Sequence, residues 1–150
     1  MRVILQRVSK ASVSVDHKVV SKIKQGVLIL LGIEMEDTLE DIDWLVKKIS
    51  QLRIFSDQHG LMNQSVLDIN GEALVVSQFT LYGSTKKGNR PSFIRAAKPD
   101  VAQPIYELFN EKLSTRLAGK VKTGIFGANM EITLLNDGPV TLFIDTKMKE

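Results

Sequence analysis

Two short segments contain the polar residues that are the strongest candidates for catalysis or binding. Ser77, Gln78 and Thr80 follow an apolar, β-rich run, so three neutral polar side chains and their backbone N–H groups come out together at a strand end. Asn136–Thr141 contains a Gly138-Pro139 pair, in which glycine allows close backbone approach and the bond before proline can be cis. Taken alone, the first segment also fits a strand terminated by local hydrogen bonds, and the second fits an ordinary turn.

The familiar catalytic signatures are missing from the rest of the chain. There is no cysteine, and the two histidines, His17 and His59, stand in polar turns where a solvated side chain is the simpler interpretation. The residue types therefore argue against a disulfide framework, a cysteine nucleophile, a histidine-based triad and a metal cluster. Acidic residues between Glu36 and Asp43 surround a helix start, where negative charge is favourable. We expect no metal and no cofactor.

The charges are nearly balanced but unevenly distributed. The chain has 20 Lys and Arg against 17 Asp and Glu, a net charge of +3. Five of the basic residues lie between Ser84 and Pro99 without an acid among them: Lys86, Lys87, Arg90, Arg95 and Lys98. This stretch could bind a polyanion such as nucleic acid, or it could be a solvated loop.

The apolar pattern predicts one α+β domain over residues 1–150. Strands are expected at 3–5, 13–15, 27–31, 73–79, 130–135 and 141–144, mostly antiparallel and barrel-like. A helix should begin after Thr38, and a second should run from near Asp100 to near Gly119 with Pro104 in its first turn. The longest apolar run, 27–33, is far too short to span a membrane, and we expect a soluble cytoplasmic protein.

Five segments in order along the chain carry a resemblance to a known family. They are Gln6-Arg7-Val8, Arg53–Asp57, Ser77–Tyr82, Arg90–Phe93 and Asn136–Thr141. In these motifs and their spacing the chain resembles the D-aminoacyl-tRNA deacylases, from Met1 to about Ile144.

The resemblance implies an editing hydrolase without a cofactor. Such enzymes cleave the ester between a D-amino acid and the terminal ribose of tRNA, and they also release glycine mischarged on tRNA(Ala). They are homodimers with shared active sites, in which a Gly-cis-Pro pair of one subunit enters the pocket of the other. Carried over by position, the catalytic residues are Gln78, Phe79 and Thr80, and the substrate-binding residues are Ser77, Arg7, Phe93, Met130, Gly138 and Pro139.

The residues are compatible with that chemistry. Backbone N–H groups near Phe79 and Thr80 could stabilise an oxyanion, and the implied attack by water, assisted by the ribose 2′-hydroxyl, needs no strong protein base. Rigid carbonyls at Gly138 and Pro139 would exclude an L side chain and let glycine pass. Two alternatives remain: Thr80 as a covalent nucleophile, which lacks a visible base, and a non-catalytic nucleic-acid-binding protein that uses the basic stretch.

Overall fold

Strand β1 (Arg2–Val15) organises the fold because it pairs with three other strands. In the computed structural model, which describes residues 1–149, it is antiparallel to β2 (Lys18–Ile23), β3 (Gly26–Gly32) and β8 (Glu131–Asp145). The turn between β1 and β2 consists of Asp16 and His17, both at positive φ. Such a two-residue turn matches the twist of an antiparallel hairpin.

The remaining strands of the main sheet are parallel. Strand β6 (Glu72–Ser77) pairs with β3 and β7 (Val121–Thr123), so the order is β2-β1-β3-β6-β7, with β8 on β1. Parallel neighbours need long crossovers, which here contain helices α1 (Leu39–Gln51) and α2 (Pro99–Arg116). A separate hairpin joins β4 (Phe55–Ser56) to β5 (Met62–Gln64). The predicted α+β class, with two main helices and a mostly antiparallel, barrel-like sheet, is confirmed.

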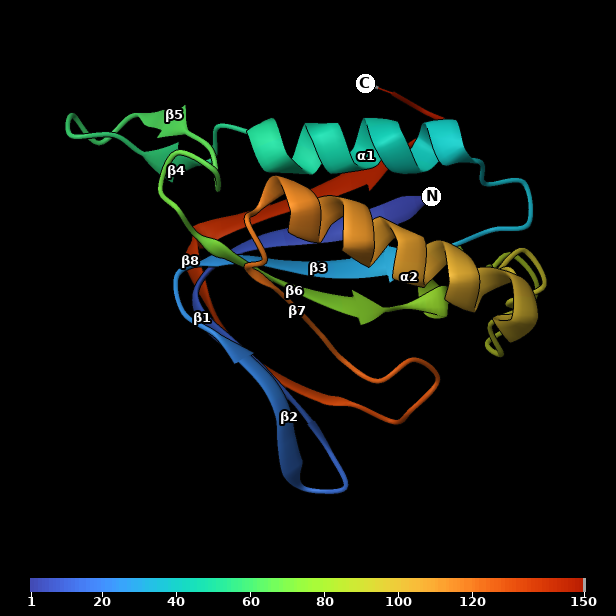
Figure 1. Ribbon diagram of the computed structural model, residues 1–150. Helices are drawn as coiled ribbons and strands as arrows, with labels where there is room; N and C mark the ends of the chain where they lie inside the picture. The colour runs from blue at the N-terminus through green and yellow to red at the C-terminus, as the bar shows by residue number, and fades with distance from the viewer. Residues whose placement is uncertain (150) are drawn as a thin grey trace.

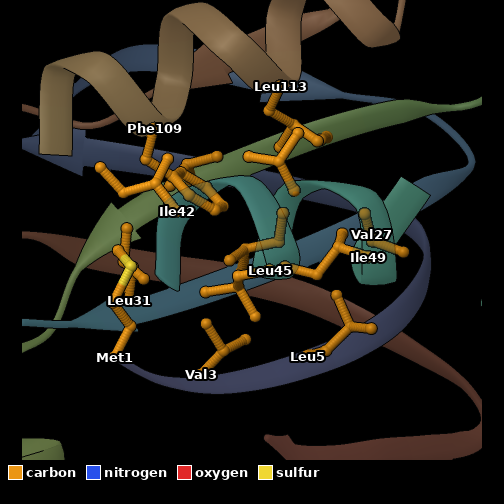
Figure 2. Close-up of a cluster of buried hydrophobic side chains, with 14 of the residues drawn as sticks. Met1, Val3, Leu5, Val27, Leu31, Ile42, Leu45, Ile49, Phe109 and Leu113 are labelled. Carbon is orange, nitrogen blue, oxygen red and sulfur yellow. The ribbon is translucent and has the colours of Figure 1, made fainter. Parts of the chain in front are cut away.

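Both helices cover the same face of the sheet (Figure 1). Helix α1 begins with a capping box in which the backbone N–H and hydroxyl of Thr38 both donate to Asp41. Its apolar face, with Leu45 fully buried, packs on the sheet beside Phe109 and Leu113 of α2 (Figure 2). This large core explains why the 3.6-residue apolar pattern predicted both helices correctly.

The other face of the sheet is covered by strands rather than helices. The β1–β2 hairpin and the first part of β8 curl away from the helices in Figure 1 and enclose a second, smaller core. Its buried members are Val8, Ala11, Val13, Ile23, Leu28, Leu74 and Val76. The sheet is therefore nearly closed like a barrel. Within residues 1–149, no helix is both long and apolar enough to cross a membrane.

Four details of the predicted elements were wrong. The strands expected at 3–5 and 13–15 are one continuous strand, β1, because its first half pairs with β3 and its second half pairs with β2. Helix α2 begins at Pro99, which puts Pro104 in the second turn; the helix continues past it because the residues around it, such as Tyr106 and Phe109, are buried. Strand β6 ends at Ser77, where the chain turns into the 3₁₀ helix η1 (Phe79–Tyr82). The last two predicted strands form one element, β8, because pairing with β1 resumes after an irregular stretch around Gly138.

Candidate active site

The Ser77–Thr80 segment lies where β6 turns away from β3. The backbone N–H of Gln78 still donates to the carbonyl of Leu31 at 2.8 Å, and the chain then enters η1. This turn packs closely on β3, because a Cβ built on Gly32 would lie 3.0 Å from the Gln78 carbonyl oxygen. Glycine at position 32 therefore allows η1 to sit directly against the end of the sheet.

The start of η1 presents several hydrogen-bonding groups together. The Gln78 side-chain amide donates to the Thr80 hydroxyl, which orients that hydroxyl. The backbone N–H groups of Phe79 and Thr80 have no protein acceptor within the described residues 1–149. Phe79 itself is 56% exposed. This arrangement can donate two hydrogen bonds to an oxygen that gains negative charge during a reaction.

A cavity of about 410 Å³ opens beside this turn. One wall is Phe93, whose ring meets the Phe79 ring edge to face with centroids 5.1 Å apart. The lining contains no charged side chain, and its members are Leu31, Ile33, Ser77, Gln78, Phe79, Phe93, Ala96, Ala97, Pro99, Ala102, Phe126 and Gly127. The cavity is thus an apolar space with neutral polar groups along one edge, the usual character of a small-molecule site.

Gly138 and Pro139 stand on a bulge of β8. Residues 137–140 of β8 lie opposite a single residue of β1, Arg7, so these four residues bulge out of the sheet. The Gly138–Pro139 peptide bond within the bulge is cis. Asn136 closes the base of the bulge, because its side-chain amide donates to the carbonyls of Arg7 and Val140, each at 3.0 Å. The exposed Gly-Pro pair is therefore presented on a tightly braced loop.

Arg7 is the main brace of this bulge. Its Nε donates to the carbonyl of Asp137 at 3.0 Å, and its Nη1 donates to the carbonyl of Ile54 at 2.6 Å. A Cβ on Gly138 would lie only 2.9 Å from Arg7 Nη2. The guanidinium, with its side chain only 11% exposed, therefore packs directly under the Gly-Pro pair.

Within one chain, the two motifs lie apart. Ser77 pairs with Leu31 near the end of β3, whereas Arg7 pairs with Val27 near its start. Those two β3 residues are four positions apart, which corresponds to about 13 Å along a strand. A single chain therefore does not place Gly138 at the cavity.

Met130 also lies away from the cavity. It packs against Gly124, where an added Cβ would be 2.5 Å from the Met130 sulfur, and against the second core. Of the residues singled out in the sequence, one chain gathers Ser77, Gln78, Phe79 and Phe93 around the cavity, with Thr80 at its edge. It leaves Arg7, Met130, Gly138 and Pro139 outside the lining.

Two buried tyrosines support the site without titrating at neutral pH. Burial raises the pKa of Tyr106 to about 12, and its hydroxyl donates to the carbonyl of Val75 at 2.8 Å, which ties α2 to β6 just before Ser77. Burial, together with the negative charges of Asp37 and Glu34, raises the pKa of Tyr82 well above its usual value. Both side chains therefore act as neutral hydrogen-bond donors.

Neither histidine lies at the cavity. The His17 side chain is 92% exposed in the β1–β2 turn, and His59 is exposed in the β4–β5 hairpin. Among residues 1–149, no three His, Cys, Asp or Glu side chains are grouped so that they could hold a metal ion. The predicted position of both histidines in solvated turns is confirmed.

Comparisons with known proteins show which family the chain belongs to. The family model for D-Tyr-tRNA(Tyr) deacylase matches residues 4–145. The chain belongs to the D-Tyr-tRNA(Tyr) deacylase family. It is 60% identical, over the full length of both chains, to proteins named D-aminoacyl-tRNA deacylase from Flavobacterium psychrophilum and Bacteroides fragilis YCH46. The resemblance recognised in the motifs is therefore confirmed.

Solved structures show how widely the D-Tyr-tRNA(Tyr) deacylase fold is shared. A protein named c-Myc DNA Unwinding Element Binding Protein has a TM-score of 0.92 and 41% identity, with 97% of this chain and 98% of that chain covered. A probable eukaryotic D-amino acid tRNA deacylase has a TM-score of 0.82, covering 95% and 97% of the two chains. At 20% identity, the second similarity concerns the fold alone.

Sequence reasoning missed the apolar half of the cavity in this member of the D-Tyr-tRNA(Tyr) deacylase family. Ala97, Ala102 and Phe126 come from three different segments and have no chemical signature of their own. The only local signal is the small size of Ala97 and Ala102, which leaves space at the start of α2. Their contribution becomes visible only when the helix is placed over the sheet.

Proposed function

We propose that this protein hydrolyses the ester bond of D-aminoacyl-tRNA, which releases the free amino acid and tRNA. The observation that carries the proposal is the uncharged cavity whose edge holds the Thr80 hydroxyl and the unpaired backbone N–H groups of Phe79 and Thr80. Family membership and the names of relatives at 60% identity support the same substrate. We therefore also propose a cytoplasmic location for the protein.

In the proposed reaction, the protein supplies donors and orientation rather than a base. The Phe79 and Thr80 N–H groups stabilise the oxyanion of the tetrahedral intermediate, a role in which losing one donor typically costs about 10²–10³ in rate. The Gln78 amide orients the Thr80 hydroxyl toward the reacting centre. Since the lining has no acid or base, the ribose 2′-hydroxyl of the substrate assists the attacking water.

We infer that a second copy of the chain completes the site. Its Gly138-Pro139 pair enters the cavity, so that the homodimer has two shared sites. Three features support this: the pair is exposed, it is held rigidly by Arg7 and Asn136, and its own chain keeps it far from Ser77. The two carbonyls then occupy the direction of an L side chain, while D-amino acids, and glycine mischarged on tRNA(Ala), are accepted.

The basic loop beside the cavity supports tRNA as the carrier of the ester. Ser84 and Ser92 exchange two backbone hydrogen bonds at 2.8 and 2.9 Å, which pin the base of this loop. Lys86, Lys87 and Arg90 lie exposed in it, next to the Phe93 wall. We propose that these three cations bind phosphates near the acceptor end of tRNA.

A comparison of two substrates tests the activity. One tRNA is charged with the D and then the L form of the same amino acid, and release is followed at equal enzyme concentration. We expect hydrolysis of the D ester and negligible hydrolysis of the L ester. Failure to cleave either ester while tRNA still binds would contradict the proposal and favour a nucleic-acid-binding protein, the function that the relative with 41% identity is named for.

The covalent alternative has its own readout. If Thr80 were the nucleophile, an acyl-enzyme would accumulate or be trapped by acid quenching and seen by mass spectrometry as a mass increase on the Thr80 peptide. Attack by water leaves no such adduct. The absence of a base among the lining residues favours water.

Mixing two inactive variants tests the shared site. One variant is Thr80→Ala, and the other is Gly138→Val, which puts a branched side chain where even a Cβ would lie 2.9 Å from Arg7 Nη2. In a mixed dimer with exchanged loops, one site is doubly damaged and the other is intact, so random mixing restores about a quarter of the wild-type activity. No recovery on mixing, with subunit exchange verified by mass spectrometry, would show that each site lies within one chain.

A further inference from the structure

Two arginines lie over the ring of Tyr82, the last residue of η1. The guanidinium carbons of Arg2 and Arg95 are 4.7 Å and 5.7 Å from the ring centroid. The ring is buried at 1% exposure, and its hydroxyl donates to Glu34 at 3.3 Å. Arg2 also donates to the carbonyl of Leu81 at 3.1 Å. The end of η1 is therefore anchored to β1 and to the segment that follows β3.

Arg95 connects the end of η1 to the wall of the cavity that Phe93 forms. Its Nη2 lies 3.6 Å from a Glu34 carboxylate oxygen, in addition to its contact with Tyr82. Arg95 belongs to the turn Phe93–Ala96, closed by a hydrogen bond from the Ala96 N–H to the Phe93 carbonyl at 3.0 Å. One side chain thus joins the turn that carries Phe93 to the residue that ends η1.

The position of that turn determines the shape of the cavity. Phe93 meets Phe79 edge to face, and its ring edge would lie 3.0 Å from a Cβ on Gly83. Ala96 and Ala97 continue the same wall, and the Ala97 N–H donates to the carbonyl of Ile33 at 2.9 Å. A shift of the turn would move the Phe93 wall relative to the donors on η1.

Arg95 differs in this respect from the other cations of the basic stretch. Lys86, Lys87, Arg90 and Lys98 form no ion pair with any residue in the described part of the chain. Arg95 has both an acidic and an aromatic partner, so its guanidinium is already engaged before any polyanion arrives.

We infer that Arg95 is a positioning residue of the proposed deacylase site, and that it holds the Phe93 wall against η1 through Tyr82 and Glu34 instead of binding a tRNA phosphate. The inference rests on the proposed function for its activity readout, but the contact itself can be tested without activity. A small displacement of a wall that orients the substrate can cost up to about 10²-fold in rate. For Arg95→Ala we expect roughly a tenfold loss of kcat.

Two substrates separate positioning from phosphate binding. The first is D-aminoacyl-tRNA, and the second is the D-aminoacyl ester of adenosine, which has no phosphate. Arg95→Ala should lower kcat by the same factor on both and leave the salt dependence of kcat/KM unchanged. Arg90→Ala, the comparison variant, should lose more on tRNA than on the ester and flatten the salt dependence by about 0.7–0.9 in logarithmic slope.

Conservative variants sharpen the test. Arg95→Lys keeps the charge but not the planar group, so a positioning role predicts a defect, whereas a phosphate contact predicts nearly normal activity. Tyr82→Phe keeps the ring but loses the hydrogen bond to Glu34, so its defect should be smaller than that of Tyr82→Leu, which should share the defect of Arg95→Ala. The double variant Arg95→Ala with Tyr82→Leu should then be no worse than either single variant.

Hydrogen exchange gives a readout that does not depend on activity. Arg95→Ala should speed amide exchange of Phe93–Ala97 relative to wild type, and Arg90→Ala should leave it unchanged. A wild-type protein that cleaves neither D ester would refute the proposed function, and the exchange data would still decide the role of Arg95. Unchanged exchange in Arg95→Ala, or a full rate on the adenosine ester with a flattened salt dependence on tRNA, would overturn the inference.

Discussion

Gly138→Ala is the substitution that most directly tests how the Gly-Pro bulge is built. Gly138 has a φ of +126°, which residues with a side chain rarely adopt, and a Cβ there would lie 2.9 Å from both Arg7 Nη2 and Val140 Cγ2. Backbone strain of this kind costs about 1–3 kcal/mol. The steric contacts add to that strain, because the partly buried Arg7 guanidinium is held by two carbonyls and cannot easily move away.

Thermal unfolding measures the cost. For a chain of this size, 1 kcal/mol corresponds to roughly 2–4 °C in Tm, so we expect Gly138→Ala to lower Tm by about 2–12 °C. The matched control is Gly60→Ala in the β4–β5 hairpin, where φ is also positive, at +76°, but no atom lies within 4 Å of the new Cβ. The control therefore reports the strain of a side chain near the left-handed region, and any excess in Gly138→Ala reports the larger strain at +126° together with the contacts to Arg7 and Val140.

The same variant should change stereochemical selectivity. If the Gly138 and Pro139 carbonyls reject L side chains, moving them should reduce the ratio of D to L hydrolysis by about tenfold or more, equivalent to at least about 1.4 kcal/mol. Gly60→Ala should keep the wild-type ratio. A Tm equal to that of Gly60→Ala together with an unchanged D to L ratio would refute both the steric and the functional reasoning.

Three further predictions concern the framework of the site. Phe109→Ala empties a fully buried position between α2 and the sheet and should lower the free energy of unfolding by about 3–5 kcal/mol in urea titrations; a loss below about 1 kcal/mol would mean that the core refills. Tyr106→Phe removes one of the two hydrogen bonds that the Val75 carbonyl accepts, the other coming from the Gly124 N–H at 3.1 Å, and should cost about 0.5–1.5 kcal/mol by the same assay, which an unchanged midpoint would contradict. Burial opposes ionisation of Asp41, but hydrogen bonds from Lys147 and its other neighbours outweigh it and hold the pKa of Asp41 well below its usual value. Its stabilisation is therefore complete above the ordinary carboxyl pKa of about 3.9 and is lost as the pH falls below that value, so the Tm difference between wild type and Asp41→Asn should shrink from pH 5 to pH 2; a constant difference would show that ionised Asp41 contributes nothing.

Local features of the chain were predictable wherever a local pattern decides the structure. The capping box at Thr38 and the apolar spacing of α1 are properties of consecutive residues, and the helix begins as expected. The end of β6 was not predictable, because Phe79 continues the apolar pattern. The reason is a tertiary contact: because Gly32 has no Cβ, η1 can pack directly against the end of β3.

The candidate site likewise has features that short segments of sequence predict and features that depend on contacts between distant segments. Motif order and spacing identify the family and single out Ser77, Gln78 and Thr80, because the chemistry of a short segment depends on its own residue types. Sequence does not reveal that Arg95, one of five similar cations, alone engages Tyr82 and Glu34, since that contact joins segments far apart in the chain.

The family, the two helices, the strand segments in β1, β3, β6 and β8, and the polar residues at the edge of the cavity were predictable from the sequence, because each depends on neighbouring residues or on the order of motifs within the chain. The three-dimensional arrangement was needed to show which apolar residues enclose the cavity, that Arg7 supports the Gly138 bulge, and that this bulge lies at the far end of β3 from Ser77. Those relations depend on strand register and on helix placement, which are set by packing among distant segments and not by any local pattern.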